Sequence, residues 1–204
     1  MAYTDAATLK TYLGASGSGD DALLTALIAR AQQAIETFCG RKFEASTETR
    51  YFDVPRGEGD YWVDGVKRSG FNARTLYLDG DLISITTLTN GDGTTIASTE
   101  YKLLPLNLTP KYAIMLKQSS NVIWEDDSDG NTEGVISVAG SWGWTSTAPA
   151  DIVHACIRLA AYYYKQKDAQ VFDVTAIPDQ GALIIPQGMP KDVKMILLPY
   201  IKHL

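Results

Sequence analysis

The segment Asp20-Asp-Ala-Leu-Leu-Thr-Ala-Leu-Ile-Ala-Arg-Ala-Gln-Gln-Ala-Ile-Glu-Thr-Phe-Cys-Gly40 contains the clearest helical pattern in this chain of 204 residues. Asp20 and Asp21 suit the start of a helix, because a carboxylate accepts hydrogen bonds from its free N–H groups. Gly40 suits the left-handed position that ends a helix. Apolar side chains recur between them at spacings of three and four residues, which predicts one amphipathic helix: Leu24, Leu27, Ile28, Ala31, Ile35 and Phe38.

Three further helices are expected, one before this segment and two at the other end of the chain. Thr4 or Asp5 suits the cap of a short helix that runs to about Leu13, where a stretch rich in glycine and serine follows. A proline fits the first turn of a long helix over 149–167, because the missing N–H has no partner there in any case. Prolines also start and end a short helix over 190–198.

Residues 46–147 have a different character, because 11 of the 17 glycines lie there among short runs of β-branched and aromatic residues. These runs predict seven strands, at Arg50–Val54, Thr75–Leu78, Leu82–Leu88, Glu100–Leu104, Ala113–Lys117, Asn121–Trp124 and Gly134–Ala139. Because Gly and Asn tolerate a positive φ, turns are expected at Asp79-Gly80, Asn90-Gly91, Asp92-Gly93 and Asp129-Gly130. The sequence therefore predicts an α+β protein. An antiparallel β-sandwich or barrel-like segment over 46–147 is inserted into a frame of about four helices, from 1–45 and 148–204.

Composition and charge exclude several classes of protein. The chain is 45% hydrophobic and 21% charged, as globular proteins are, and it has no apolar run long enough to cross a bilayer. Its first residues lack the basic and apolar regions of a secretory signal, so we expect neither secretion nor membrane insertion. The net charge of −6 argues against a protein that grips nucleic-acid phosphates. Residues 46–147 carry 8 basic and 14 acidic side chains and supply essentially all of this negative charge.

The chain offers little for catalysis or for cofactor and metal binding. His154 follows Asp151 by three residues, the spacing of a general base held by a carboxylate, but we expect a helix-surface or partly buried histidine instead. Residues 140–143 lack the first glycine of a nucleophile elbow. Residues 125–130 are similar to part of a calcium loop, but Ile136 stands where the bidentate glutamate belongs. We therefore expect no enzyme, no cofactor and no metal.

The two cysteines, Cys39 and Cys156, have no CxxC partner and fall on apolar helix faces, which predicts buried, reduced thiols and no zinc. All four tryptophans lie in the middle segment, and Trp142 and Trp144 share one strand face by alternation. They serve either packing or, as the alternative function, carbohydrate binding by an exposed platform. No role follows from the sequence for residues 57–72 and 169–189.

Three stretches of the chain together resemble one protein family. The first is the run from Asp20 to Phe43. The second is Gly140-Ser-Trp-Gly followed by Ala148-Pro-Ala-Asp-Ile-Val-His-Ala-Cys-Ile-Arg-Leu-Ala-Ala-Tyr-Tyr-Tyr-Lys165. The third is Met189-Pro-Lys-Asp-Val-Lys-Met-Ile-Leu-Leu-Pro-Tyr200. In their order and separation they are similar to the head–tail connector proteins of tailed bacteriophages, also called adaptor or head-completion proteins, and the β-rich middle is similar to longer members with a β insertion.

The resemblance implies a structural protein of the virion neck, assembled in the host cytoplasm. Such proteins form a homo-oligomeric ring, usually taken as a dodecamer, beneath the portal protein. The ring extends the DNA channel and presents a surface to the next component, a stopper or tail-completion protein. The acidic composition fits this role independently, because a negative surface lets a genome slide past without specific binding.

Two groups of residues are candidates for contacts with other chains. The tyrosines Tyr162, Tyr163 and Tyr164 point in several directions from one helix, which indicates an inter-subunit contact. The apolar residues of 190–204 run nearly around a short helix, so we expect one side covered by the protein and another by a partner. The local basic charge suits an acidic partner surface, and the family resemblance implies that this partner is the portal. The candidates for portal docking are Lys191, Lys194, Ile196, Leu197, Tyr200, Ile201 and Lys202.

Overall fold

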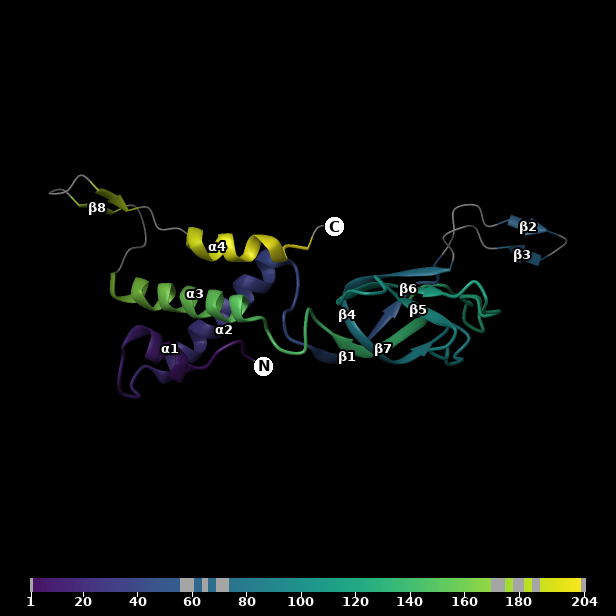
Figure 1. Ribbon diagram of the computed structural model, residues 1–204, viewed down its shortest axis with the longest axis horizontal. Coiled ribbons are helices and arrows are strands. Elements are labelled where there is room, and N and C mark those ends of the chain that lie inside the picture. The colour runs from purple at the N-terminus through teal and green to yellow at the C-terminus, as the bar shows by residue number, and fades with distance from the viewer. Residues whose placement is uncertain are drawn as a thin grey trace. The chain divides into compact units, whose positions relative to one another are not determined.

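The chain forms two compact units in a computed structural model that describes residues 2–55, 61–63, 66–68, 74–169, 175–177, 182–184 and 188–202 (Figure 1). The helical unit combines the two ends of the chain, Met1–Phe43 and Ala148–Leu204. The β unit is the stretch Glu44–Thr147 between them. Segments at opposite ends of the sequence therefore share one hydrophobic core.

The helical unit contains the four expected helices: α1 (Ala6–Leu13), α2 (Asp21–Cys39), α3 (Ala150–Ala169) and α4 (Lys191–Leu197), with a 3₁₀ turn at Leu198–Tyr200. The Asp5 carboxylate accepts a hydrogen bond of 2.7 Å from the N–H of Thr8 and so caps α1. Gly40 takes the left-handed conformation at the end of α2, with φ of 66°. These two caps confirm the predicted start of α1 and the predicted end of α2. Asp20 occupies the N-cap position of α2, but its side chain makes no capping hydrogen bond there, so the carboxylate cap predicted for this helix is wrong.

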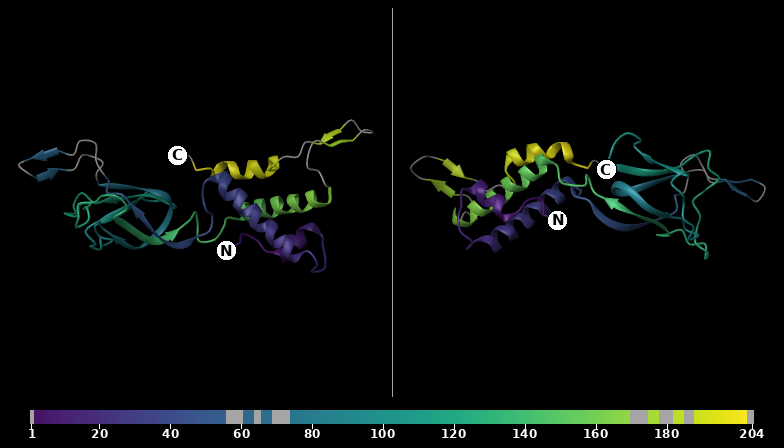
Figure 2. Two further views of the ribbon diagram at one scale, coloured as in Figure 1. Left: turned by 180° about the vertical axis from the view of Figure 1, so that it is seen from behind. Right: turned by 60° about the horizontal axis from the view of Figure 1, so that its bottom comes forward.

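The helices pack through their apolar faces, with α2 against α3 and α4 beside them (Figure 2). The face that α2 buries consists of Leu24, Ile28, Ala31, Ile35 and Cys39. Facing residues of α3 have almost no exposed surface: Ile152, Ala155, Cys156, Leu159 and Ala160. Burial of this apolar area is the main stabilising contribution in the unit.

The β unit contains a five-stranded antiparallel sheet in the order β1-β7-β4-β6-β5. Its strands are β1 (Ser46–Phe52), β4 (Thr75–Thr89), β5 (Tyr101–Leu104), β6 (Lys111–Leu116) and β7 (Ile136–Trp142). Two separate hairpins are formed by β2 (Tyr61–Val63) with β3 (Val66–Arg68) and by β8 (Thr175–Ile177) with β9 (Ala182–Ile184). The predicted α+β class, with an antiparallel β segment inserted between helices, is confirmed.

Strand β4 corrects the prediction of two strands separated by a turn at Asp79-Gly80. The strand is continuous, and it pairs with β6 at its start and with β7 after Leu82, with an irregularity in register between them. Gly80 is needed here for close approach, because a Cβ on it would lie 2.2 Å from a guanidinium nitrogen of Arg50. A glycine in a bent strand gives the same sequence signal as a glycine in a turn.

The predicted strand at Asn121–Trp124 is also wrong, because this segment is a loop. The buried side chain of Asn90 provides its hydrogen bonds in place of a neighbouring strand. Its Nδ2 donates to the carbonyl of Ile123 at 2.9 Å, and its Oδ1 accepts from the N–H of Glu125 at 3.0 Å. The turns expected around Asn90-Gly91, Asp92-Gly93 and Asp129-Gly130 are present.

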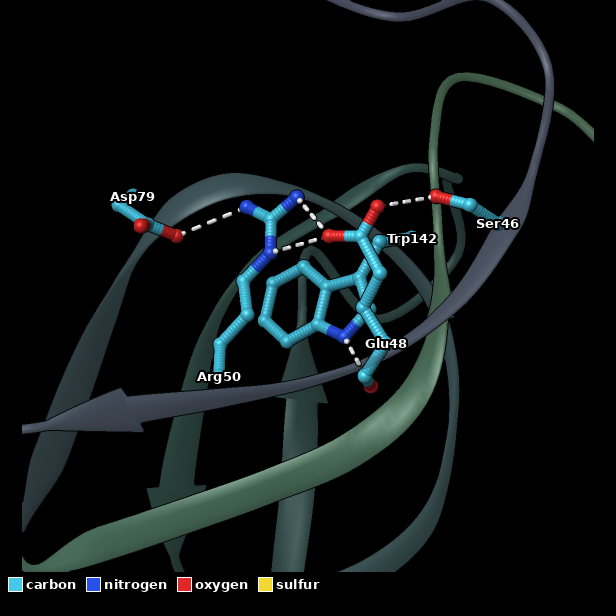
Figure 3. Close-up of polar contacts among 5 residues, drawn as sticks. All are labelled: Ser46, Glu48, Arg50, Asp79 and Trp142. Carbon is cyan, nitrogen blue, oxygen red and sulfur yellow. Dashed lines mark hydrogen bonds and ion pairs between the residues drawn. The ribbon is translucent and has the colours of Figure 1, made fainter.

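Trp142 organises one side of the β-unit core and has only 1% of its surface exposed. Its indole N–H donates to the Glu48 carbonyl oxygen at 3.2 Å, and its ring stacks on Phe52 with 6.1 Å between centroids. The Arg50 guanidinium lies 4.2 Å from the centre of the same indole (Figure 3). Arg50 also pairs with the carboxylates of Glu48 and Asp79, both at 3.0 Å, and so connects β1 to β4.

We predict that both cysteines are unreactive in the folded protein. Burial raises the pKa of Cys39 to about 11 and that of Cys156 to about 12, so at pH 8 roughly one thiol in a thousand or fewer is the reactive thiolate. Both thiols are free and buried. Alkylation followed by mass spectrometry should modify neither cysteine until denaturant is added. A disulfide in the unreduced protein, or modification of the folded protein, contradicts this.

We also predict that Trp142→Ala destabilises the β unit by about 3–5 kcal/mol, because it leaves a cavity and removes the surface on which Arg50 lies. Trp144→Ala is the matched control, since Trp144 is half-buried and lies beyond the end of β7. Urea unfolding followed by circular dichroism should show a much larger loss for the first variant. Equal losses would show that Trp142 has no special role in the core.

Candidate docking surfaces

The three consecutive tyrosines of α3 are all half-buried, and each contacts its own chain. Tyr164 donates from its hydroxyl to the Asp20 carboxylate at 2.5 Å, and the Lys167 ammonium lies 4.8 Å from its ring centre. The ring of Tyr162 lies against that of Tyr163, with 6.2 Å between centroids. Each ring therefore keeps a part of its surface for contact outside the helical unit.

Tyr163 faces a groove on the helical unit with a volume of about 680 Å³. The guanidinium of Arg30 lies 4.6 Å from the centre of the Tyr163 ring, and burial raises the pKa of the phenol. The floor is mainly apolar, with Arg30 and Lys194 as its cations. The lining residues come from α2, α3 and the start of α4: Arg30, Gln33, Ala34, Thr37, Phe38, Tyr163, Gly188, Met189 and Lys194.

Helix α4 buries one face and exposes the other. Val193 and Leu197 have no exposed surface, whereas 67% of Met195 and 47% of Leu198 are exposed. Leu197 therefore belongs to the internal packing of the helical unit and not to its docking surface, which corrects its inclusion among the candidates. Met195 and Leu198 were not among the candidates. Met195 is two residues from both Val193 and Leu197, which places it on the opposite side of the helix and is a signal that could have found it. Leu198 lies in the 3₁₀ turn that follows α4.

The other docking candidates surround this exposed face. Lys191 and Lys194 are exposed, and four residues are half-buried: Ile196, Tyr200, Ile201 and Lys202. The last of these donates its backbone N–H to the carbonyl of Cys39 at 2.8 Å. Tyr200 packs edge-on against Phe43, with 5.6 Å between ring centroids. The segment after α4 is therefore attached to the end of α2.

Polar contacts also attach α4 to the body of the helical unit. Arg158 of α3 forms an ion pair with Asp192 and donates a hydrogen bond of 3.0 Å to the hydroxyl of Tyr12. The bond to Tyr12 and then the bond to Asp192 raise the pKa of Arg158. Since Asp192 is paired within the chain, Lys191 and Lys194 determine the charge of the exposed face.

The structure does not support two other hypotheses from the sequence, the general base His154 and the tryptophan platform for carbohydrate. His154 lies edge-on to Tyr12 at 6.4 Å, while Asp151 accepts from the Tyr200 hydroxyl at 3.5 Å, so no carboxylate-held base is formed by this pair. Trp142 is buried, so the proposed platform of Trp142 and Trp144 for carbohydrate is wrong. The side chain of Trp62, most of 57–72 and most of 169–189 lie outside the described residues.

The acidic loop at 125–130 satisfies its own backbone. One oxygen of the Asp127 carboxylate accepts from the N–H groups of Asp129 and Asn131, at 2.9 and 2.7 Å. In the part of the chain that the structure describes, no group of three His, Cys, Asp or Glu side chains is arranged to hold a metal ion. None of the helices in the described ranges combines the length and hydropathy needed to cross a bilayer.

Comparisons with known proteins support the same fold and give the family. The chain has 18% identity, and a TM-score of 0.56, to a chain of the structure "Neck of empty GTA particle computed with C6 symmetry", covering 97% of this chain and 88% of that one. To a chain of "Neck of native GTA particle computed with C12 symmetry" the identity is 17% and the TM-score 0.54, covering 97% of this chain and 88% of that one. To a chain of "Virion of native gene transfer agent (GTA) particle" the identity is 18% and the TM-score 0.55, covering 97% of this chain and 89% of that one. Among curated proteins, no sequence matches this chain.

The family model described as "Head completion protein" matches residues 3–203, which include both segments of the helical unit and the whole β unit. The match therefore extends over nearly all of the chain, including the inserted sheet. On this evidence, the chain belongs to the head completion protein family.

Proposed function

We propose that this protein is a structural component of the neck of a tailed phage or phage-like particle and has no enzymatic activity. It forms a ring beneath the portal, extends the DNA channel and docks the next component, a stopper or tail-completion protein. The observation that carries the proposal is the family match over residues 3–203. The particle is assembled in the host cytoplasm, and the protein remains in the virion neck.

The solved structures of similar fold support a ring. Two are titled as necks of a GTA particle, computed with C6 and with C12 symmetry. A ring of twelve copies is compatible with both symmetries. We therefore propose a dodecamer.

The exposed face of α4 is the proposed portal-docking surface. Met195 and Leu198 provide its apolar centre, and a helix that presents an apolar face is a common way to occupy a groove in a partner. Lys191 and Lys194 lie on the same short helix and attract an acidic partner surface, which increases the rate of encounter. Ile196, Tyr200, Ile201 and Lys202 lie at the edge of this contact.

The groove beside Tyr163 is the proposed contact with the neighbouring copy in the ring. It is mainly apolar, and its two cations lie where they can pair with carboxylates of the neighbour. Tyr162 and Tyr164 extend this surface along α3. Half-buried aromatic side chains suit such contacts, because a large ring contributes apolar area while losing few rotamers.

The charge of the chain supports passage of DNA through the ring. The net charge is −6, and the β unit, Glu44–Thr147, carries 8 basic and 15 acidic side chains. A surface of this sign repels phosphates over about 8–10 Å at ordinary ionic strength. DNA in the lumen is therefore kept from binding, and we propose no specific nucleic-acid contact and no membrane contact.

Electron microscopy of the purified protein, alone and with its portal, tests the proposal. We expect rings under at least one of these conditions, and a protein that stays monomeric with its portal present contradicts the proposed function. Ala34→Arg should reduce ring formation, because it places a long cation on the floor of the groove. Ala29→Arg is the control on the same helix, since Ala29 is exposed and lies outside the groove. Equal effects of the two variants would show that the groove is not the contact.

Portal binding by α4 is tested by Met195→Asp. Because 67% of Met195 is exposed, the free energy of unfolding of this variant should stay within about 0.5 kcal/mol of the wild type. Its affinity for the portal should fall by roughly tenfold or more. Met195→Leu retains the apolar area and should bind as the wild type does. Point variants are preferable to deletion of the helix, because Val193 and Leu197 are part of the core. Wild-type incorporation of Met195→Asp into portal-containing capsids would contradict this surface.

A further inference from the structure

The exposed apolar side chains of the β unit include two groups, at different places, that the proposed function leaves unexplained. The first is the tip of the loop between β5 and β6, where 62% of Leu106 and 68% of Leu108 are exposed, with Tyr112 at 53% just inside β6. The second is near the start of β4, where 65% of Tyr77 is exposed. Single exposed leucines are common, but three neighbouring apolar side chains form a patch that requires an explanation.

The loop tip is attached at its base by one lysine. The Lys111 ammonium donates to the carbonyl oxygen of Pro105 at 2.6 Å and to that of Leu106 at 3.1 Å. These bonds join the two ends of the loop and position a cation behind the leucines. A loop that is ordered before binding loses less conformational entropy in a contact.

The second place is a hollow of about 380 Å³ between the end of β1 and the start of β4. The ion pair of Arg50 and Asp79 connects these two strands (Figure 3). On its rim is Asp53, which is exposed and accepts a hydrogen bond of 2.7 Å from the N–H of Gly134. The lining is mostly apolar: Phe52, Asp53, Val54, Pro55, Thr75, Leu76 and Tyr77.

The tip and the hollow lie toward opposite ends of strand β6. The register pairs Lys111, next to the tip, with Leu82, whereas Met115 pairs with Thr75 of the hollow. Tyr77 of the hollow pairs with Ala113, so two to four residues of strand, about 7–13 Å at the usual rise, separate Lys111 from the hollow. The loop that carries the tip leaves β6 at Lys111, on the side of that residue away from Ala113 and Met115, so the tip of one copy is free to meet the hollow of another.

We infer that the Leu106–Leu108 tip of one copy inserts into this hollow on the next copy of the chain, a contact that rests on the ring proposed above. Two different patches on one subunit are what a head-to-tail contact requires, and such contacts form a ring when the rotation between successive copies closes. The occupant is complementary in character, because leucines enter a mostly apolar hollow. It is complementary in charge, because Lys111 behind the tip approaches Asp53 on the rim.

Disulfide crosslinking between variants that each carry one introduced cysteine tests the contact. Rings containing both Leu108→Cys and Tyr77→Cys chains should give a crosslinked dimer under mild oxidation, whereas rings of either variant alone should not. The native Cys39 and Cys156 are buried and do not interfere. Ile123→Cys replaces Tyr77→Cys in the control, since 46% of Ile123 is exposed but it lines neither patch. Crosslinking of Leu108→Cys to itself, or no crosslink in mixed rings seen by microscopy, overturns the inference.

A second measurement covers the case in which an introduced cysteine is badly oriented. The double variant Leu106→Asp/Leu108→Asp should weaken ring association roughly 30-fold, the loss typical of a contact with two buried anchors. Ile123→Asp should leave association unchanged. Equal association of both variants with the wild type overturns the contact. If the wild type forms rings and these tests fail, only the tip contact is wrong; if the wild type never forms rings, the proposed function fails first.

Discussion

The packing of α2 against α3 is the interaction on which the rest of the structure depends. It joins residues from both ends of the chain, and the loss of water contact by faces that include Ile35 and Leu159 provides its free energy. Cys39 near the end of α2 and Cys156 near the start of α3 are both buried in this core. The inserted β unit, Glu44–Thr147, therefore begins and ends at the same helical unit. The groove beside Tyr163 and the buried side of α4 exist only because this pair is formed.

The β unit is stabilised separately, by a small hydrophobic core packed against its five-stranded sheet. Arg50 lies on the buried indole of Trp142 and pairs with carboxylates on two strands, so one side chain both covers apolar surface and connects β1 to β4. The close approach of Arg50 explains the glycine at position 80. This arrangement also fixes the two strands between which the hollow opens, so internal packing and the proposed contact share the same elements.

The exposed apolar side chains are divided between the two units in a way that suits an assembly. Met195 is exposed on α4 and Leu198 on the 3₁₀ turn after it, and Leu106 and Leu108 are exposed on the β5–β6 loop. In each case neighbouring side chains of the same segment are buried or held, as Val193 and Lys111 illustrate. An apolar side chain on an ordered support loses little entropy when it binds, which is the physical basis for treating these places as contacts rather than as defects in packing.

The sequence by itself determined the four helices, the cap of α1 by Asp5, the end of α2 at Gly40, the α+β class and the resemblance to the connector family. These depend on local features, such as the spacing of apolar residues in α2 and the conformational freedom of Gly40. Only the tertiary structure decided that Asp79-Gly80 lies within a strand, that Asn121–Trp124 is a loop and that Trp142 is buried. It also showed that Leu197 is buried, whereas Met195 and Leu198 are exposed. The reason is common to all of them: burial and close approach depend on which distant segment lies opposite, and a sequence pattern carries no information about that partner.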